Sequence, residues 1–209
     1  MINIFRTRET KEIKFLLSRH IHRCYNMETN QGGTPMHLET QRLILRPITQ
    51  EDFAAWKELL GDPETMAHYP KPYDDQGVQR WIDWTLKNYE TCGFGLWALI
   101  LKENGRFIGD CGITMQNING KTVPEIGYHL HKAYWRRGLG SEAALRCMQY
   151  AFEDLNMPAV YSYMTSSNAA SWGVAVKNGM TLVEEYVDPL DGPHRVYRMT
   201  KEEWQSLRK

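Results

Sequence analysis

Residues 125–155 constrain the fold of this chain more than any other segment, because they join a strand, a basic turn and a helix. Residues 125–130 form a short, mostly apolar run, which is typical of a buried strand. The turn in residues 134–142 is basic and contains two glycines. The residues beyond it predict a helix, since apolar side chains recur there at the spacing of one helical face: Ala144, Leu145, Met148, Ala151, Phe152 and Leu155.

A strand followed by such a turn and a helix start makes a binding site for an anion. Gly138 and Gly140 let the backbone approach a ligand closely, and the first amides of a helix have no partner within it. The helix dipole adds partial positive charge at the same end. Lys132, Arg136 and Arg137 bring full charges nearby. The pattern therefore predicts that a phosphate or pyrophosphate group binds at this turn.

Three kinds of phosphate site are compatible with a turn of this type. A P-loop requires Gly-x-x-x-x-Gly-Lys-Ser/Thr, and the sequence contains no such string. A dinucleotide-binding turn requires Gly-x-Gly-x-x-Gly/Ala early in a βαβ unit, with an acidic residue about 20 positions later. Ala143 fits the third small position, but the turn lies late in the chain, and Asn168 stands downstream instead of an acid. The third ligand is coenzyme A.

The turn resembles the pyrophosphate motif of the GNAT superfamily of acyl-CoA-dependent N-acetyltransferases. That motif is Gln/Arg-x-x-Gly-x-Gly/Ala, and residues 135–140 match it except at Trp135. Tryptophan at this position is similar to the variant in the branch that acetylates ribosomal-protein N-termini. Three further segments resemble that branch in the right order, namely residues 39–47, 125–128 and 168–180, with Met180 where phenylalanine is usual. The resemblance covers roughly residues 37–200.

The chain reads as alternating strands and helices, which predicts a three-layer α/β (α+β) domain. Asn104-Gly105 and Asn119-Gly120 predict hairpin turns, and Asp74 or Asp75 predicts the start of a helix whose apolar face includes Trp81. The resemblance implies a mixed, mostly antiparallel sheet flanked by helices, with splayed central strands. Expected strands are 43–47, 95–101, 106–115, a strand ending near 130, 159–165, 181–187 and 195–200; expected helices are 49–60, one from 74 or 75, the long helix after the basic turn, and 168–178.

Length and composition favour one domain with its own core, over residues 37–209. The 25 basic and 25 acidic residues balance, so no global field attracts nucleic acid or an anionic membrane. Cys24, Cys92, Cys111 and Cys147 form no Cys-x-x-Cys pair and are typical of reduced thiols in a cytoplasmic protein. No apolar run reaches the length of a membrane span. We expect no membrane or nucleic-acid partner, and the sequence leaves a homodimer open.

Residues 1–36 form a separate unit with six basic and three acidic residues, ending in a glycine-containing stretch. A short helix over residues 9–24 fits the pattern. The segment is either an accessory extension or a product of an early start codon, with Met27 or Met36 as the alternative start. His20-x-His22-x-Cys24 has metal-binding residue types but no fourth ligand at a suitable spacing, so no metal site is predicted.

The resemblance implies where acetyl-CoA binds. In the family the pantetheine arm pairs with the exposed backbone of the central strand, and the pyrophosphate contacts the turn amides. The implied cofactor-binding residues are Tyr128, His129, Leu130, Arg136, Arg137, Gly138, Leu139, Gly140, Ser141 and Asn168. Asn168 can also cap the helix that it precedes. Side chains on Gly138 and Gly140 are expected to be poorly tolerated.

Acyl transfer to an amine needs a base, because lysine and α-amines are largely or partly protonated at pH 7. Glu125 is the first candidate, since it lies in an otherwise apolar strand, and a glutamate recurs there in the resembling branch. His129 and His131 are alternative bases, and alternation places His129 on the same face as Glu125. A carboxylate at a sheet edge that faces solvent is the structural alternative for Glu125.

The leaving thiolate needs a proton donor. Many family members use a tyrosine seven residues after the asparagine, but Ala175 stands there. Ser171 is the implied replacement, and the alternative is a serine that satisfies a backbone amide at the helix start. Nothing around Cys111 or Cys147 marks a nucleophile, so transfer is expected to be direct.

The acceptor is expected to be a primary amine, either a protein N-terminal α-amine or a small molecule. Residues 68–73 form an aromatic, proline-containing loop, and Trp81, Trp84 and Trp97 lie on neighbouring elements. These tryptophans line a groove or, as their size favours, pack in the core. The sequence thus predicts an acetyl-CoA-dependent N-acetyltransferase without a metal. The rival function is a non-catalytic acyl-CoA-binding module that regulates or docks a partner.

Overall fold

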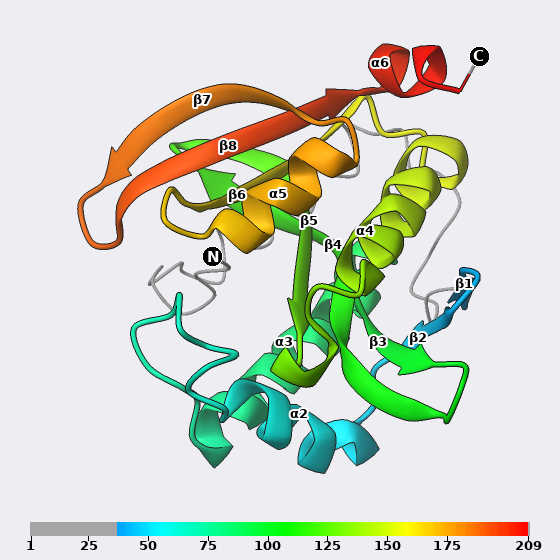
Figure 1. Ribbon diagram of the computed structural model, residues 1–209, viewed down its shortest axis with the longest axis vertical. Helices are drawn as coiled ribbons and strands as arrows, with labels where there is room; N and C mark the ends of the chain where they lie inside the picture. The colour runs from blue at the N-terminus through cyan, green and yellow to red at the C-terminus, as the bar shows by residue number, and fades with distance from the viewer. Residues whose placement is uncertain (1–36, 209) are drawn as a thin grey trace.

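The computed structural model describes residues 37–208, which are built around an eight-stranded sheet (Figure 1). The strands lie in the order β1-β2-β3-β4-β5-β6-β8-β7. Neighbours are antiparallel except for β5 and β6, which are parallel. The strands are β1 (Leu38–Glu39), β2 (Leu43–Pro47), β3 (Leu96–Leu101), β4 (Arg106–Ile118), β5 (Lys121–Leu130), β6 (Ala159–Thr165), β7 (Thr181–Asp188) and β8 (Gly192–Thr200). The predicted sheet type is confirmed.

Helices cover both faces of this sheet. One apolar cluster joins α2 (Phe53–Leu60) and α3 (Asp75–Cys92) to the sheet, and a second joins α4 (Leu139–Gln149) and α5 (Ala169–Lys177) to it. Strand β3 shows that the clusters lie on opposite faces, because Leu96 and Ala98 belong to the first and the alternating residues Trp97 and Leu99 to the second. The three-layer arrangement is therefore confirmed. A short α6 (Lys201–Ser206) follows β8.

Local signals in the sequence fix several of these elements. Asp74 caps α3 by accepting a hydrogen bond from the Gly77 amide at 2.8 Å, and Gly93 ends the helix in a left-handed conformation with φ 73°. The predicted Asn-Gly turns lie between β3 and β4 and between β4 and β5. Thr49 and Asp52 form the expected capping box, but they open a 3₁₀ turn (η1, Gln50–Asp52) that precedes α2. A second 3₁₀ turn, η2 (Lys132–Tyr134), follows β5.

The sheet is interrupted between β5 and β6. Their ladder consists of one aligned pair, Glu125 opposite Tyr161. Beyond that pair, residues 126–130 and 162–165 diverge and line opposite sides of a cavity. The expected splay of the central strands is therefore present, and it opens immediately after Glu125.

Two local predictions are wrong. Leu145 was expected on the buried face of α4, but it is 39% exposed, and the chain leaves regular helical geometry for a π-helical turn (η3) at Tyr150–Asp154. Ala151 and Phe152 are buried in that turn as predicted, whereas Leu145 lies beside the buried face that Ala144 and Met148 share with them.

The last hairpin turn was expected at residues 191–193, but Asp188 pairs with Gly192, so the turn comprises residues 189–191. The Asp188 carboxylate fixes this turn by accepting hydrogen bonds from the amides of Leu190 and Asp191, at 2.8 and 3.0 Å. The predictions for residues 1–36, including the helix over 9–24 and the His20-His22-Cys24 group, lie outside the described residues.

Candidate active site

A cavity of about 670 Å³ occupies the gap between β5 and β6. Its walls come from these two strands, from the turn before α4, from α5 and from residues 64–69 of the α2–α3 loop. The predicted site residues that line it are Glu125, Tyr128, His129, Leu130, Arg136, Gly138, Leu139, Gly140, Ser141, Asn168 and Ser171. Segments far apart in the sequence thus meet in one space.

Arg137 lies outside the set of lining residues. Its guanidinium is 3.9 Å from the Glu103 carboxylate and 5.5 Å from the centre of the Tyr134 ring. Lys132, which the sequence placed among the charges of the anion site, instead forms ion pairs with Asp62 and Glu64 at 2.9 and 3.0 Å. Both basic side chains are therefore engaged with protein groups.

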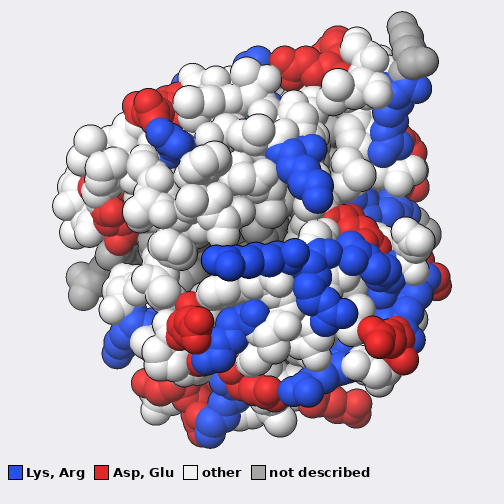
Figure 2. Space-filling model, in the orientation of Figure 1, with Lys and Arg blue, Asp and Glu red and all other residues white. Residues whose placement is uncertain are grey.

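The turn before α4 has the geometry of an anion site. Gly138 is the N-cap residue with φ 76°, a left-handed conformation that favours glycine, and the first amides of α4 follow it. A β-carbon at Gly138 would lie 3.6 Å from a terminal nitrogen of Arg42 and 3.7 Å from Nζ of Lys177. Two cations from distant parts of the chain therefore flank the turn, and Figure 2 shows basic side chains gathered across the middle of this face.

At Gly140, by contrast, a β-carbon would meet no protein atom within 4 Å. A methyl group therefore has room at this position when no ligand is bound.

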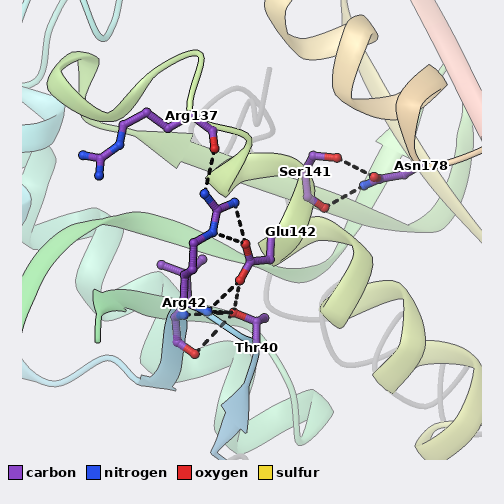
Figure 3. A network of polar contacts seen from close by, with 7 residues as sticks. Thr40, Arg42, Arg137, Ser141, Glu142 and Asn178 are labelled. Carbon is purple, nitrogen blue, oxygen red and sulfur yellow. Dashed lines mark hydrogen bonds and ion pairs between the residues drawn. The ribbon is translucent and has the colours of Figure 1, made fainter. Parts of the chain in front are cut away.

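A network of polar contacts holds the turn in place (Figure 3). The Glu142 carboxylate accepts hydrogen bonds from Thr40 Oγ1, from the Arg42 amide and from Arg42 Nε, at 2.5, 2.9 and 2.6 Å. Arg42 also donates to the Arg137 carbonyl at 2.9 Å. The acidic residue that follows the anion motif thus ties the β1–β2 connection to the turn.

A second contact ties the turn to the end of α5. The Ser141 hydroxyl donates to Asn178 Oδ1 at 2.6 Å, and Asn178 Nδ2 donates to the Ser141 carbonyl at 3.1 Å (Figure 3). The side chain of Ser141 is therefore engaged, while its amide belongs to the first turn of α4.

Replacing Glu142 with glutamine should lower the free energy of unfolding by about 1–2 kcal/mol, because charge-assisted hydrogen bonds from Thr40 and Arg42 become neutral ones. Burial acts to raise the pKa of Glu142, but these hydrogen bonds outweigh it and lower the pKa below 4.5. The stability gained from the charge is therefore present at neutral pH and is lost as the pH falls through the lowered pKa. Urea denaturation at pH 7 and pH 3.5 measures both effects.

Glu90→Gln is the matched control, because Glu90 forms an exposed pair with Lys87 on α3. Its effect should stay within about 0.5 kcal/mol. Equal losses in the two variants would show that the Glu142 network contributes no more than a surface ion pair.

Glu125 lies at the point where β5 and β6 separate. The side chain lines the cavity, and the residue is only 2% exposed, so the alternative of a solvent-facing edge carboxylate is wrong. Thr114 Oγ1 donates to Glu125 Oε2 at 3.4 Å. Burial raises the pKa of Glu125 to about 7, against the opposing effect of this hydrogen bond. The carboxyl can therefore gain or lose a proton near neutral pH.

Tyr128 and Ser171 form a second polar group, on the α5 side of the sheet. The Tyr128 hydroxyl donates to the Ser171 carbonyl at 2.9 Å, and the two hydroxyl oxygens lie 3.1 Å apart. Asn168 Oδ1 accepts from the Ser171 amide at 3.1 Å, so Asn168 caps α5 as predicted, and the Ser171 hydroxyl is not the cap. Burial raises the pKa of Tyr128 well above its usual value, so its hydroxyl stays protonated at neutral pH.

His129 faces the opposite side, with Glu125. Its Nδ1 lies 2.9 Å from Asp110 Oδ1, and its Nε2 lies 2.5 Å from the Tyr69 hydroxyl. His131, the other candidate base, does not line the cavity; its ring lies 3.9 Å from the Glu58 carboxylate. The side chain of His129 thus belongs to a hydrogen-bonded chain, while its backbone belongs to the strand beside the gap.

The aromatic residues that the sequence suggested for an acceptor pocket are divided between the cavity and the core. His68 and Tyr69 line the cavity, whereas Trp81 and Trp97 are fully buried in the two apolar clusters and Trp84 is half-buried. The core assignment of Trp81 and Trp97 is confirmed.

Sequence reasoning missed Arg42, Lys177, Asp110 and Ser162 as residues of the site or its support. Ser162 lines the cavity and hydrogen-bonds to Tyr128. Of these four residues, Asp110 could have been recognised from the sequence, because a charged residue in the middle of an apolar strand needs a partner.

The described part of the chain has neither a metal-binding cluster nor a membrane-spanning helix. Within residues 37–208, no three His, Cys, Asp or Glu side chains come together as metal ligands. No helix in that range is both long and apolar enough to cross a membrane.

The chain matches the model of the acetyltransferase (GNAT) domain over residues 42–181. It is 35% identical over 144 residues to the uncharacterized protein YkkB of Bacillus subtilis, covering 68% of this chain and 84% of that protein. It is 29% identical over 190 residues to the FsC-acetyl coenzyme A-N(2)-transacetylase of Aspergillus fumigatus, covering 82% and 79%.

Solved structures share the fold. The ribosomal alpha-N-protein acetyltransferase RimL, solved in complex with coenzyme A, superposes with a TM-score of 0.67 at 14% identity, covering 80% of this chain and 99% of RimL. The resemblance drawn from residues 135–140 is confirmed, and ribosomal-protein acetyltransferases are among the structural neighbours. The chain belongs to the GNAT acetyltransferase family and is an acetyl-CoA-dependent acyltransferase.

Proposed function

We propose that this protein transfers an acetyl group from acetyl-CoA directly to a primary amine, either a protein N-terminal α-amine or the amine of a small molecule. The observation that carries the proposal is the buried Glu125 carboxyl, at the point of the cavity where β5 and β6 separate. A base that titrates near pH 7 suits an acceptor that arrives as an ammonium ion. Names given to relatives, an N(2)-transacetylase and an alpha-N-protein acetyltransferase, support an amine acceptor.

The residues along the cavity fit acetyl-CoA. The backbone of residues 126–130 is not paired with β6, so its polar groups are available to an extended pantetheine arm. The first amides of α4 with Arg136 and Lys177 suit a pyrophosphate, while Arg42 holds the turn through Glu142. Tyr128, His129, Leu130 and Asn168 then border the arm, and Gly138 to Ser141 border the phosphates.

Each polar group then has a defined task. Acetyl-CoA supplies the activated acyl group. Glu125 takes a proton from the acceptor amine at its carboxylate oxygen, directly or through a water molecule. The hydroxyl of Ser171, supported by Tyr128, donates a hydrogen bond or a proton to the departing sulfur. Positioning of the two reactants supplies a large share of the rate.

Initial rates with acetyl-CoA and three acceptors test the proposal. The acceptors are a peptide with a free alanine N-terminus, the same peptide with its N-terminus blocked, and 2-phenylethylamine. Acetylated product should form with at least one free amine and not with the blocked peptide. Intersecting double-reciprocal plots are expected for direct transfer, and parallel plots would contradict it. Tight binding of acetyl-CoA without turnover of any amine would favour a non-catalytic acyl-CoA-binding module.

Replacing Ser171 with alanine should lower kcat by about 10- to 100-fold while leaving the affinity for acetyl-CoA within twofold, because the lost hydroxyl serves the leaving sulfur. Tyr128→Phe should have a smaller effect, since Tyr128 acts on Ser171. Steady-state kinetics with saturating acetyl-CoA, together with calorimetric titration, separate the two quantities. An unchanged kcat in the double variant would remove both residues from the mechanism.

A further inference from the structure

The wall of the cavity on the α3 side carries a hydrogen-bonded chain of three residues. Asp110 is completely buried, and its two carboxylate oxygens lie 2.9 and 3.2 Å from His129 Nδ1. His129 Nε2 lies 2.5 Å from the hydroxyl of Tyr69. Tyr69 and His129 both line the cavity. This series of hydrogen bonds thus runs from the core of the sheet to the cavity surface.

The fold holds this chain firmly. Asp110 and His129 lie directly opposite one another on β4 and β5. The strands come so close here that a β-carbon on Gly109 would lie 2.1 Å from the His129 carbonyl oxygen. The Trp81 ring packs edge-on against the imidazole, with centroids 5.2 Å apart. The imidazole therefore has one orientation.

The loop that carries Tyr69 is held separately. Lys132 forms ion pairs with Asp62 and Glu64 in this loop, and the Tyr73 amide donates to the Leu60 carbonyl at 2.9 Å. The loop is therefore attached by contacts other than the Tyr69 hydroxyl as well.

The direction of the hydrogen bonds depends on the buried carboxylate and on the number of protons on the imidazole. A carboxylate accepts, so Nδ1 carries a proton, and when the ring carries no second proton, Nε2 accepts from the Tyr69 hydroxyl. The single proton of that hydroxyl is then committed, and the oxygen presents only lone pairs to the cavity. The Asp110-His129 pair thus turns the phenol into a hydrogen-bond acceptor.

We propose that the hydroxyl oxygen of Tyr69 binds the acceptor amine by accepting a hydrogen bond from one of its N–H groups. His129 and Asp110 position the Tyr69 hydroxyl for this task. The inference rests on the proposed function and adds the acceptor-binding group to it. Tyr69 contacts His129, which lies on the same side of the sheet as Glu125, and both Tyr69 and Glu125 line the cavity. An amine bound by Tyr69 thus lies in the same space as the Glu125 carboxyl.

Tyr69→Phe tests the role of the hydroxyl alone, since the ring is kept. With the best acceptor from the three described above, KM for the amine should rise about tenfold, the size of one lost hydrogen bond, while kcat and the affinity for acetyl-CoA stay within twofold. Tyr73→Phe is the matched control, because Tyr73 lies in the same loop, packs against Trp81 and does not line the cavity. It should leave all three quantities unchanged.

A double-mutant cycle tests whether His129 acts through Tyr69. His129→Gln should raise the amine KM in the wild-type background and have no further effect in the Tyr69→Phe background. Additive effects would show that the two residues act independently. A normal amine KM in Tyr69→Phe, or an equal rise in Tyr73→Phe, would overturn the proposal even if His129→Gln fails to fold. A wild-type protein that acetylates no amine would instead overturn the proposed function.

Discussion

Replacing Glu125 with glutamine should lower kcat by about 100- to 10,000-fold, the usual contribution of a general base. The affinity for acetyl-CoA should stay within twofold, because glutamine keeps the shape of the side chain and the ligand-binding turn lies at the other end of the cavity. Stopped-time product assays and calorimetric titration of the same preparation measure the two quantities. A variant that turns over at the wild-type rate would show that another group accepts the proton.

The pH dependence of the reaction identifies the base further. Because burial raises the pKa of Glu125 to about 7, kcat/KM of the wild-type protein should rise tenfold per pH unit below pH 7 and level off above it. The ionisation of the amine affects kcat/KM of the wild-type protein and of Glu125→Gln alike. The contribution of Glu125 is therefore the pH dependence of the ratio of the two kcat/KM values. A ratio that does not change between pH 5.5 and 8 would exclude Glu125 as the base.

The same carboxyl should make the fold less stable as the pH rises. The unfolded chain loses this proton near pH 4.5, whereas the folded protein keeps it up to about pH 7. Between these values the folded state binds more protons, so the free energy of unfolding falls with rising pH, by about 3 kcal/mol in total. Glu125→Gln lacks this loss. From pH 4 to pH 8, the free energy of unfolding should therefore fall more in the wild-type protein than in Glu125→Gln. Urea denaturation at the two pH values measures the difference.

Replacing Gly138 with glutamate should weaken acetyl-CoA binding by at least about 100-fold. The residue has φ 76°, where an L side chain costs about 1–2 kcal/mol, and the new carboxylate would lie beside Arg42 and Lys177. It would pair with Lys177, which suits a pyrophosphate, and repel the ligand's charges. Calorimetric titration with acetyl-CoA measures the loss.

Two controls separate the ligand effect from the strain. Gly120→Glu introduces the same charge at the same kind of backbone, with φ 80°, in the β4–β5 turn at the opposite end of β5 from the anion turn, and it should leave acetyl-CoA affinity unchanged. Gly140→Ala adds a methyl group that meets no protein atom within 4 Å, so any loss of affinity must come from the ligand. Full binding by both Gly138→Glu and Gly140→Ala would contradict the assignment of the turn as the phosphate site.

The parts of the molecule that depend on local sequence were predictable. The Asn-Gly turns, the Asp74 cap and the apolar face around Trp81 each arise from neighbouring residues, and the structure contains all of them. The strand-turn-helix at Gly138 was likewise visible, because glycine, basic charge and helical periodicity lie within one short segment. The pitch change at Tyr150 was not visible, since a π-helical turn shifts the buried face without a distinctive residue type.

The support of the site depends on contacts between distant residues and could not be read from the sequence. Arg42 and Glu142 are 100 positions apart, and Tyr69 and His129 are 60 apart. Alternation placed Glu125 and His129 on one face, but it could not tell which face other elements cover. The burial of Glu125, and with it the raised pKa, comes from packing by the helices and loops that surround the cavity.

The interruption of the sheet divides the domain into two blocks, β1 to β5 and β6 to β8. Strand pairing across the gap consists of one aligned residue pair, Glu125 with Tyr161, whereas hydrogen bonds such as Tyr128 to Ser171 and Ser141 to Asn178 and a shared apolar cluster join the blocks beside it. Beyond that pair, the facing edges of β5 and β6 are not joined by backbone pairing. A substrate that contacts both edges supplies the connection that the sheet lacks there. The rigidity of the domain should therefore rise when substrate binds and fall when product leaves.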